Sequence, residues 1–122
     1  MENRKTILIC DDEPTLRELV RASLDGGYRF VEASDGLVAI ELARELEPDV
    51  VILDLMLPRV GGLEVLAELR ADEKLRRVPV LVITAWNETR EDVLAAGAAD
   101  FVAKPFDPDE LRAAIEKLLS GA

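Results

Sequence analysis

The sequence contains no histidine and a single cysteine, and these two shortages exclude several kinds of chemistry. Without histidine, the chain cannot form a Ser-His-Asp triad, bind a metal through imidazole or carry a phosphoryl group on histidine. Cys10 has no second cysteine to pair with, so the chain contains no internal disulfide and fits a reducing compartment. Because Cys10 ends an apolar segment, a packing role is favoured over a redox role.

Long apolar segments and an excess of positive charge are also missing. No apolar run approaches the length of a membrane span, and residues 1–6 lack the apolar stretch of a signal peptide. The formal net charge is −10, so the surface is expected to repel nucleic acid. We therefore expect a single cytoplasmic domain over residues 1–122, with no nucleic-acid partner and no membrane contact.

What the sequence does contain is a regular alternation of short apolar runs and amphipathic stretches. The predicted strands are Thr6–Cys10, residues 28–33, Val50–Leu53, residues 78–83 and residues 101–103. Apolar residues at helical spacing follow each run, beginning at Pro14, at Ser34 or Asp35, after Gly61, at Glu91 and at Asp107. This alternation predicts an α/β fold, a doubly wound parallel sheet with helices on both faces. In such sheets, ligands bind beyond the carboxyl ends of the strands.

Polar residues occupy those carboxyl ends. Asp11 and Asp12 follow the first predicted strand, Asp54 follows the third, Thr84 the fourth and Lys104 the fifth. Three crowded carboxylates repel one another unless a cation lies between them, and an all-oxygen set favours Mg²⁺ or Mn²⁺. Together with the cation, the ammonium and hydroxyl groups would neutralise the oxygens of a phosphoryl group. Asp54 then becomes a nucleophile of the aspartyl-phosphate type.

Each of these residues alone also has an ordinary structural explanation. Asp11 or Asp12 is expected to cap the helix that begins at Pro14. Thr84 is a normal strand residue, and a lysine that precedes a proline, as Lys104 does, is commonly solvated. The joint occurrence of these residues at four strand ends is what favours a site.

The sequence resembles the response-regulator receiver family in four segments: ILICDDEPTLRELV, PDVVILDLMLPRVGGLEVL, VPVLVITA and GAADFVAKPFDPDEL. The resemblance implies a flavodoxin-like, five-stranded parallel sheet in the order 2-1-3-4-5 with five helices. It also implies a phosphorelay switch whose donor is a histidine kinase or a histidine phosphotransfer protein. The output would pass through a downstream protein or an output domain absent from this sequence. Such a domain is not an enzyme in the usual sense, although it carries out Mg²⁺-dependent self-phosphorylation and autodephosphorylation.

By position, the resemblance assigns roles to the residues at the centre of the site. Asp54 resembles the phosphoacceptor. Asp12 resembles the main Mg²⁺ ligand, with Asp11 assisting largely through water, and Asp54 and the backbone carbonyl of Met56 complete the metal set. Lys104 would form an ion pair with the bound phosphoryl group.

Further roles fall on residues around this centre. The Thr84 hydroxyl and the Ala85 backbone N–H would contact the phosphoryl group, and Thr84 would act with Phe101 as the conformational switch. Met56 and Trp86 would form a gate for the hydrolytic water; neither side chain orients water well, so we expect a long-lived phosphoryl group. The segment between residues 84 and 104 is slightly shorter than in the family, which predicts a trimmed fourth helix or preceding loop.

Three other functions fit this sequence less well. A phosphohydrolase of the haloacid dehalogenase type also uses an aspartate nucleophile, but it needs a second aspartate two residues later, where this chain has Met56. A flavin or dinucleotide carrier needs glycines and N–H groups where this chain has the acidic segment CDDEPT. A phosphorylation-independent interaction domain is expected to have lost part of the acidic, threonine or lysine set, and this sequence retains all of it.

Overall fold

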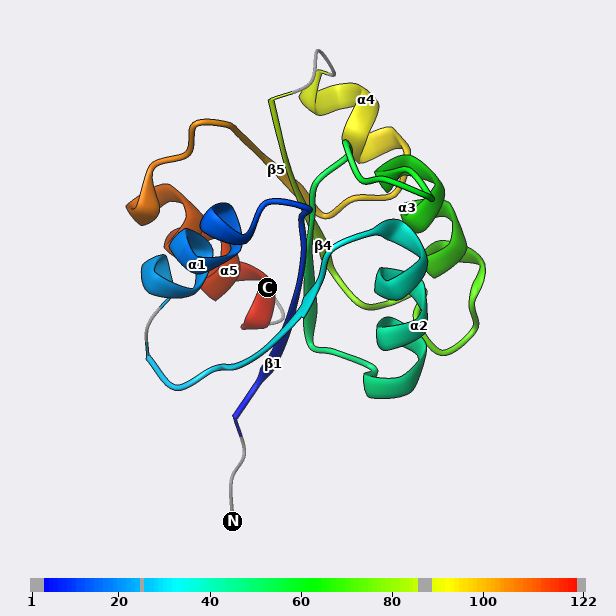
Figure 1. Cartoon of the computed structure of the whole chain (residues 1–122), viewed down its shortest axis with the longest axis horizontal. Helices are drawn as coiled ribbons and strands as arrows, with labels where there is room; N and C mark the ends of the chain where they lie inside the picture. The colour runs from blue at the N-terminus through cyan, green and yellow to red at the C-terminus, as the bar shows by residue number, and fades with distance from the viewer. Residues whose placement is uncertain (1–3, 25, 86–88, 121–122) are drawn as a thin grey trace.

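Five parallel strands form one sheet in the order β2-β1-β3-β4-β5 in the computed structural model of the chain, which describes residues 4–24, 26–85 and 89–120 (Figure 1). The strands are β1 (Thr6–Cys10), β2 (Arg29–Ala33), β3 (Val50–Leu53), β4 (Val80–Thr84) and β5 (Asp100–Ala103). Each neighbouring pair is parallel. The predicted fold class and strand order are therefore confirmed.

Helices cover both faces of the sheet. They are α1 (Pro14–Ser23), α2 (Gly36–Leu46), α3 (Gly62–Ala71), α4 (Arg90–Ala95) and α5 (Pro108–Leu119). One face carries α1 and α5, and the other carries α2, α3 and α4 (Figure 1). Within the ranges described, no helix is long and apolar enough to cross a membrane.

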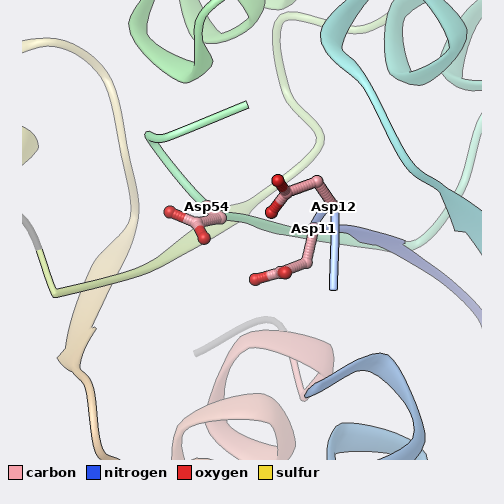
Figure 2. Close-up of side chains that lie close together, drawn as sticks. All are labelled: Asp11, Asp12 and Asp54. Carbon is pink, nitrogen blue, oxygen red and sulfur yellow. The ribbon is translucent and has the colours of Figure 1, made fainter. Parts of the chain in front are cut away.

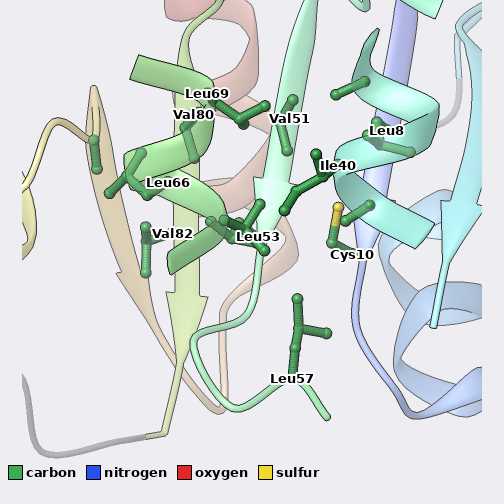
Figure 3. Close-up of a cluster of buried hydrophobic side chains, with 14 of the residues drawn as sticks. Leu8, Cys10, Ile40, Val51, Leu53, Leu57, Leu66, Leu69, Val80 and Val82 are labelled. Carbon is green, nitrogen blue, oxygen red and sulfur yellow. The ribbon is translucent and has the colours of Figure 1, made fainter. Parts of the chain in front are cut away.

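An apolar core lies between each face of the sheet and the helices that cover it, because successive side chains of a strand point to opposite faces. Leu8, Cys10 and Leu53 pack toward α2 and α3 (Figure 3). Ile7 and Ile9 pack toward α1 and α5. All four residues of β3 are buried, as expected for the central strand of a parallel sheet. Burial, followed by the nearby Asp11 charge, raises the pKa of the Cys10 thiol, in agreement with a packing role.

Some predicted boundaries are wrong by one or two residues. The strand predicted over residues 78–83 is Val80–Thr84, because the residues before it form a turn that Arg70 holds by donating to the carbonyls of Arg76 and Val78. The helix predicted from residue 91 begins at Arg90, where the Thr89 side chain caps it by accepting the Asp92 N–H. This helix, α4, has only six residues, as expected from the short segment.

Candidate functional site

Three carboxylates meet where β1 and β3 end. Figure 2 shows Asp11, Asp12 and Asp54 directed into a common space, and one carboxylate oxygen from each lies within 4.8 Å of the others. The register explains their approach, because Cys10 pairs with Leu53 and the next residues therefore leave the sheet side by side. Asp11 is 3% exposed and Asp54 is 4% exposed, whereas Asp12 is exposed to solvent.

Lys104 connects the two buried carboxylates. Its Nζ lies 2.6 Å from Asp54 Oδ2 and 3.0 Å from Asp11 Oδ2. The lysine side chain is only 16% exposed, so the alternative of a solvated lysine is wrong. The backbone N–H of Lys104 donates to the Thr84 carbonyl at 3.1 Å, which fixes the end of β5 against β4. A largely shielded positive charge is thus positioned beside two negative charges, which offsets the repulsion between the two carboxylates.

Asp54 is held as an ionised carboxylate. Burial acts to raise its pKa, but the hydrogen bonds from Lys104 and from the Met56 backbone N–H outweigh burial, so the pKa lies below its ordinary value. The Met56 N–H donates to Asp54 Oδ1 at 2.9 Å. The pKa of Lys104 is raised, because its bonds to the two carboxylates outweigh the effect of burial. The arrangement therefore provides an anionic carboxylate beside a fixed cation.

The pKa of Asp11 is shifted in the opposite direction. Burial, reinforced by the neighbouring Asp54 carboxyl, raises the pKa of Asp11 to about 6, although the Glu13 N–H and Lys104 oppose the rise. Its Oδ1 accepts the Glu13 N–H at 2.8 Å. The prediction that Asp11 or Asp12 caps α1 is wrong, since the N-cap position is Glu13, whose side chain makes no capping bond. Asp11 instead closes the turn that precedes the helix.

The remaining predicted site residues surround this cluster. Thr84 is buried at the carboxyl end of β4, and the exposed Ala85 follows it. Phe101 is half-buried on β5, opposite Val82. Met56 is 58% exposed in the loop after Asp54. Trp86 lies outside the described residues.

The loop after β3 approaches the start of α3 very closely. A Cβ atom on Gly62 would lie 2.4 Å from the Leu55 Cα and 2.5 Å from the Asp54 carbonyl oxygen. The Gly62 N–H donates to the Leu55 carbonyl at 3.1 Å. A cavity of about 410 Å³ lies between this loop, the first turn of α3 and Asp12. Gly61 and Gly62 are equivalent neighbours in the sequence, but only Gly62 is required by this contact.

The arrangement of acids and lysine agrees with the result of family comparison. The family model described as the response regulator receiver domain matches residues 7–116. The chain belongs to this family. Receiver domains are the signalling modules of two-component systems, so the predicted family and general function are confirmed.

Two curated relatives illustrate the match to this receiver domain. The DNA-binding dual master transcriptional regulator RpaA of Synechocystis is 41% identical over 116 residues, which cover 93% of this chain and 48% of that protein. The DNA-binding response regulator MtrA of Mycolicibacterium smegmatis is 43% identical over 119 residues, covering 95% of this chain and 51% of that protein. The chain thus spans about half the length of these relatives.

Solved structures share the whole receiver fold. A putative response regulator from Chloroflexus aurantiacus has a TM-score of 0.90 and 31% identity, covering 97% of this chain and 99% of that one. The chemotaxis response regulator CheY4 of Vibrio cholerae has a TM-score of 0.87 and 28% identity, covering 96% of this chain and 100% of that one. The individual roles of Thr84, Ala85 and Phe101 in this receiver stay predictions.

Proposed function

We propose that Asp54 accepts a phosphoryl group in the presence of Mg²⁺ and that this modification switches the output face of the domain. The observation that carries the proposal is the Lys104 ammonium, which bridges the buried Asp54 and Asp11 carboxylates at 2.6 and 3.0 Å beside the exposed Asp12. Buried carboxylates with a bridging cation form a site for negative charge that arrives from outside.

The donor atoms fit a hard divalent cation. Asp11, Asp12 and Asp54 offer carboxylate oxygens within 4.8 Å of one another, and the Met56 carbonyl is the fourth proposed ligand. Oxygen-only sets of this kind suit Mg²⁺, and they suit Mn²⁺ as well. When bound, the metal ion would neutralise phosphoryl oxygens and so lower the barrier to attack on phosphorus.

Side chains and one backbone N–H of the protein would carry out the rest of the reaction. An ionised Asp54 oxygen attacks the phosphorus of phosphohistidine; the new P–O bond forms as the P–N bond breaks, and the imidazole leaves with the bonding electron pair and takes up a proton. Lys104 then pairs with a phosphoryl oxygen, and the Thr84 hydroxyl and Ala85 N–H donate to the others. Met56 stands where a phosphohydrolase would need a general acid, which favours a lasting phosphoryl group over rapid turnover.

The partners we propose follow from this chemistry. A cytoplasmic histidine kinase or histidine phosphotransfer protein would be the donor. Movement of Thr84 toward the phosphoryl group would let Phe101 turn and alter the face made by α4, β5 and α5. That face would then act on a downstream protein or on a further domain. Direct binding of nucleic acid by this acidic chain is not part of the proposal.

Mass measurement of the intact protein tests the assignment. Incubation with acetyl phosphate and Mg²⁺ should add one phosphoryl group to the parent protein and none to Asp54→Asn, because an amide does not attack phosphorus. Asp109→Asn alters an exposed carboxylate on α5 and should label like the parent. Undiminished labelling of Asp54→Asn would overturn the proposal.

Metal binding can be followed by thermal unfolding. Only the folded chain brings the three carboxylates together, so Mg²⁺ binds the native state and must raise the melting temperature. Asp12→Ala should lose most of that rise. If the melting temperature of the parent does not change with Mg²⁺, the proposed metal site is wrong.

A further inference from the structure

Two arginines of α1 share one glutamate of β2, and only one of them reaches the acidic pair. Arg17 Nε lies 2.7 Å from Glu32 Oε1, and Arg17 Nη1 lies 2.6 Å from the backbone carbonyl oxygen of Asp11. Arg21 contacts the other carboxylate oxygen of Glu32. Arg17 is mostly buried, whereas Arg21 is more open to solvent.

The fold explains why these three side chains meet. Arg17 and Arg21 are four residues apart on a helix and therefore lie on the same face. Glu32 pairs in register with Ile9, whose side chain packs toward α1 and α5, so Glu32 points to the same side of the sheet. The guanidinium of Arg17 is planar and presents donors in a fork, which lets it bond a carboxylate and a carbonyl at once.

The carbonyl that Arg17 holds belongs to the peptide unit linking Asp11 to Asp12. On the other side of Asp11, its N–H donates to the Ala33 carbonyl at 3.1 Å. Because a peptide unit is planar, a fixed carbonyl also fixes the direction in which the next residue leaves. Asp12 is exposed, so the direction of its carboxylate depends on this peptide unit more than on packing around its own side chain.

We propose that Arg17 is a positioning residue of the metal site: its bond to the Asp11 carbonyl orients the acidic pair, and Glu32 holds Arg17 in place for that task. The inference rests on the proposed function of Asp11, Asp12 and Asp54 as metal ligands. Arg17 touches none of the metal-binding oxygens and acts through the backbone. Mutation of groups that orient metal ligands typically weakens metal affinity by about 10-fold to 100-fold.

Arg21 provides a matched control, because it shares the helix, the charge and the glutamate but does not contact Asp11. Arg17→Met and Arg21→Met both keep an apolar side chain on α1 and both remove an ion pair with Glu32. Both are therefore expected to lower the melting temperature measured without metal. Only Arg17→Met is expected to weaken metal binding.

The experiment is a titration of the folded protein with Mn²⁺, in which free Mn²⁺ is measured by electron paramagnetic resonance. Arg17→Met should bind Mn²⁺ about tenfold more weakly than the parent, whereas Arg21→Met should match the parent. Arg17→Lys keeps the charge and can reach one of the two acceptors, so its affinity should fall between those of the parent and Arg17→Met. This second variant also serves if Arg17→Met fails to fold.

The outcomes separate this inference from the proposed function. If the parent binds Mn²⁺ and all three variants bind it equally well, Arg17 has no positioning role and only this inference is overturned. An equal loss of affinity in Arg17→Met and Arg21→Met also overturns it, because the effect then comes from the helix and not from the Asp11 carbonyl. A parent that does not bind Mn²⁺ overturns the metal site and this inference together.

Discussion

On the β1 side of the site, Asp11 is held through its N–H, its carbonyl and both carboxylate oxygens. The partners lie on three segments of the chain: β2, the start of α1 and the residue that follows β5. On the β4–β5 side, α4 has six residues, of which Val93 is buried and the others are exposed. This short helix is tied to β5 by Arg90, an exposed side chain that donates to the Phe101 carbonyl at 3.2 Å and pairs with Asp100.

We therefore expect the two sides to differ in the free energy needed to move them. Buried charged groups lose a large interaction energy when one partner leaves, whereas an exposed ion pair contributes little. The chemistry requires acids that stay in place, and signalling requires an element with a second arrangement close in energy. We expect Asp11 and its partners, which include Lys104 and which we call the fixed side, to meet the first requirement. We expect α4 and the start of β5, which we call the mobile side, to meet the second.

The largest effect is expected from removing the positive charge of the fixed side. Lys104→Met leaves Asp11 and Asp54 facing each other without their bridging ammonium, so the free energy of unfolding without metal should fall by about 3 kcal/mol. Mg²⁺ should restore part of the loss, because it supplies charge to the same carboxylates. Urea unfolding with and without Mg²⁺ measures both effects.

Lys117→Met is the control for that experiment, because Lys117 lies exposed near the end of α5. If Lys104→Met is no less stable than Lys117→Met, the bridging ammonium does not hold the fixed side together.

A smaller effect is expected from two adjacent glycines at the start of α3. Gly62→Ala places a Cβ against the backbone of Asp54 and Leu55, so it should lower the free energy of unfolding by about 2 kcal/mol. Gly61→Ala should change it by less than about 0.5 kcal/mol, because the nearest atom to a new Cβ is a flexible Glu64 oxygen at 3.6 Å. Equal stability of the two variants would show that the loop can move away from α3.

These glycines also mark how far the sequence alone could predict this structure. The strands, their order and the meeting of Asp11, Asp12 and Asp54 follow from local patterns and from one rule, that parallel strands end at the same edge. The close approach of Gly62 to Asp54 depends on how a loop packs against a helix, and no periodicity encodes it. Gly61 and Gly62 look equivalent in the sequence.

For a similar reason, the sequence alone could not identify Arg17 as a positioning residue. It is one of several charged residues on α1, and its pairing with Glu32 of β2 is a long-range contact that no local pattern indicates. The prediction that Asp11 or Asp12 caps α1 is wrong, because the Asp11 carboxylate bonds to Lys104 and to the Glu13 N–H. Local rules identified the right residues here but not the contacts that long-range packing selects.

The lifetime of the phosphoryl group should depend on the loop after Asp54. Met56→Asn supplies donors and acceptors that can orient an attacking water, so dephosphorylation should become severalfold faster. Met56→Leu keeps an apolar side chain and should leave the rate near that of the parent. The decay of the phosphorylated mass after removal of donor gives the rates, and identical decay in both variants would exclude Met56 as the water gate.

The smallest effect on stability is expected on the mobile side. Arg90→Met breaks an exposed pair and should lower the free energy of unfolding by less than about 1 kcal/mol. Amide hydrogen exchange should nevertheless become faster in α4 and at the start of β5, because Arg90 joins the first turn of α4 to Asp100 and Phe101. Arg112→Met, which breaks an exposed pair within α5, should leave those amides unchanged. Faster exchange in α1 as well would mean that the two sides are not independent.

We propose that Asp54, and neither of the two carboxylates beside it, carries the phosphoryl group. Borohydride reduces an acyl phosphate to an alcohol, with loss of phosphate, so it converts a phosphorylated aspartate to homoserine that peptide mass spectrometry can locate. After treatment with acetyl phosphate and Mg²⁺, and then borohydride, we expect homoserine at position 54 and unmodified aspartate at positions 11 and 12. Homoserine at Asp11 or Asp12, or none at Asp54 in protein that has gained the phosphoryl mass, would contradict it.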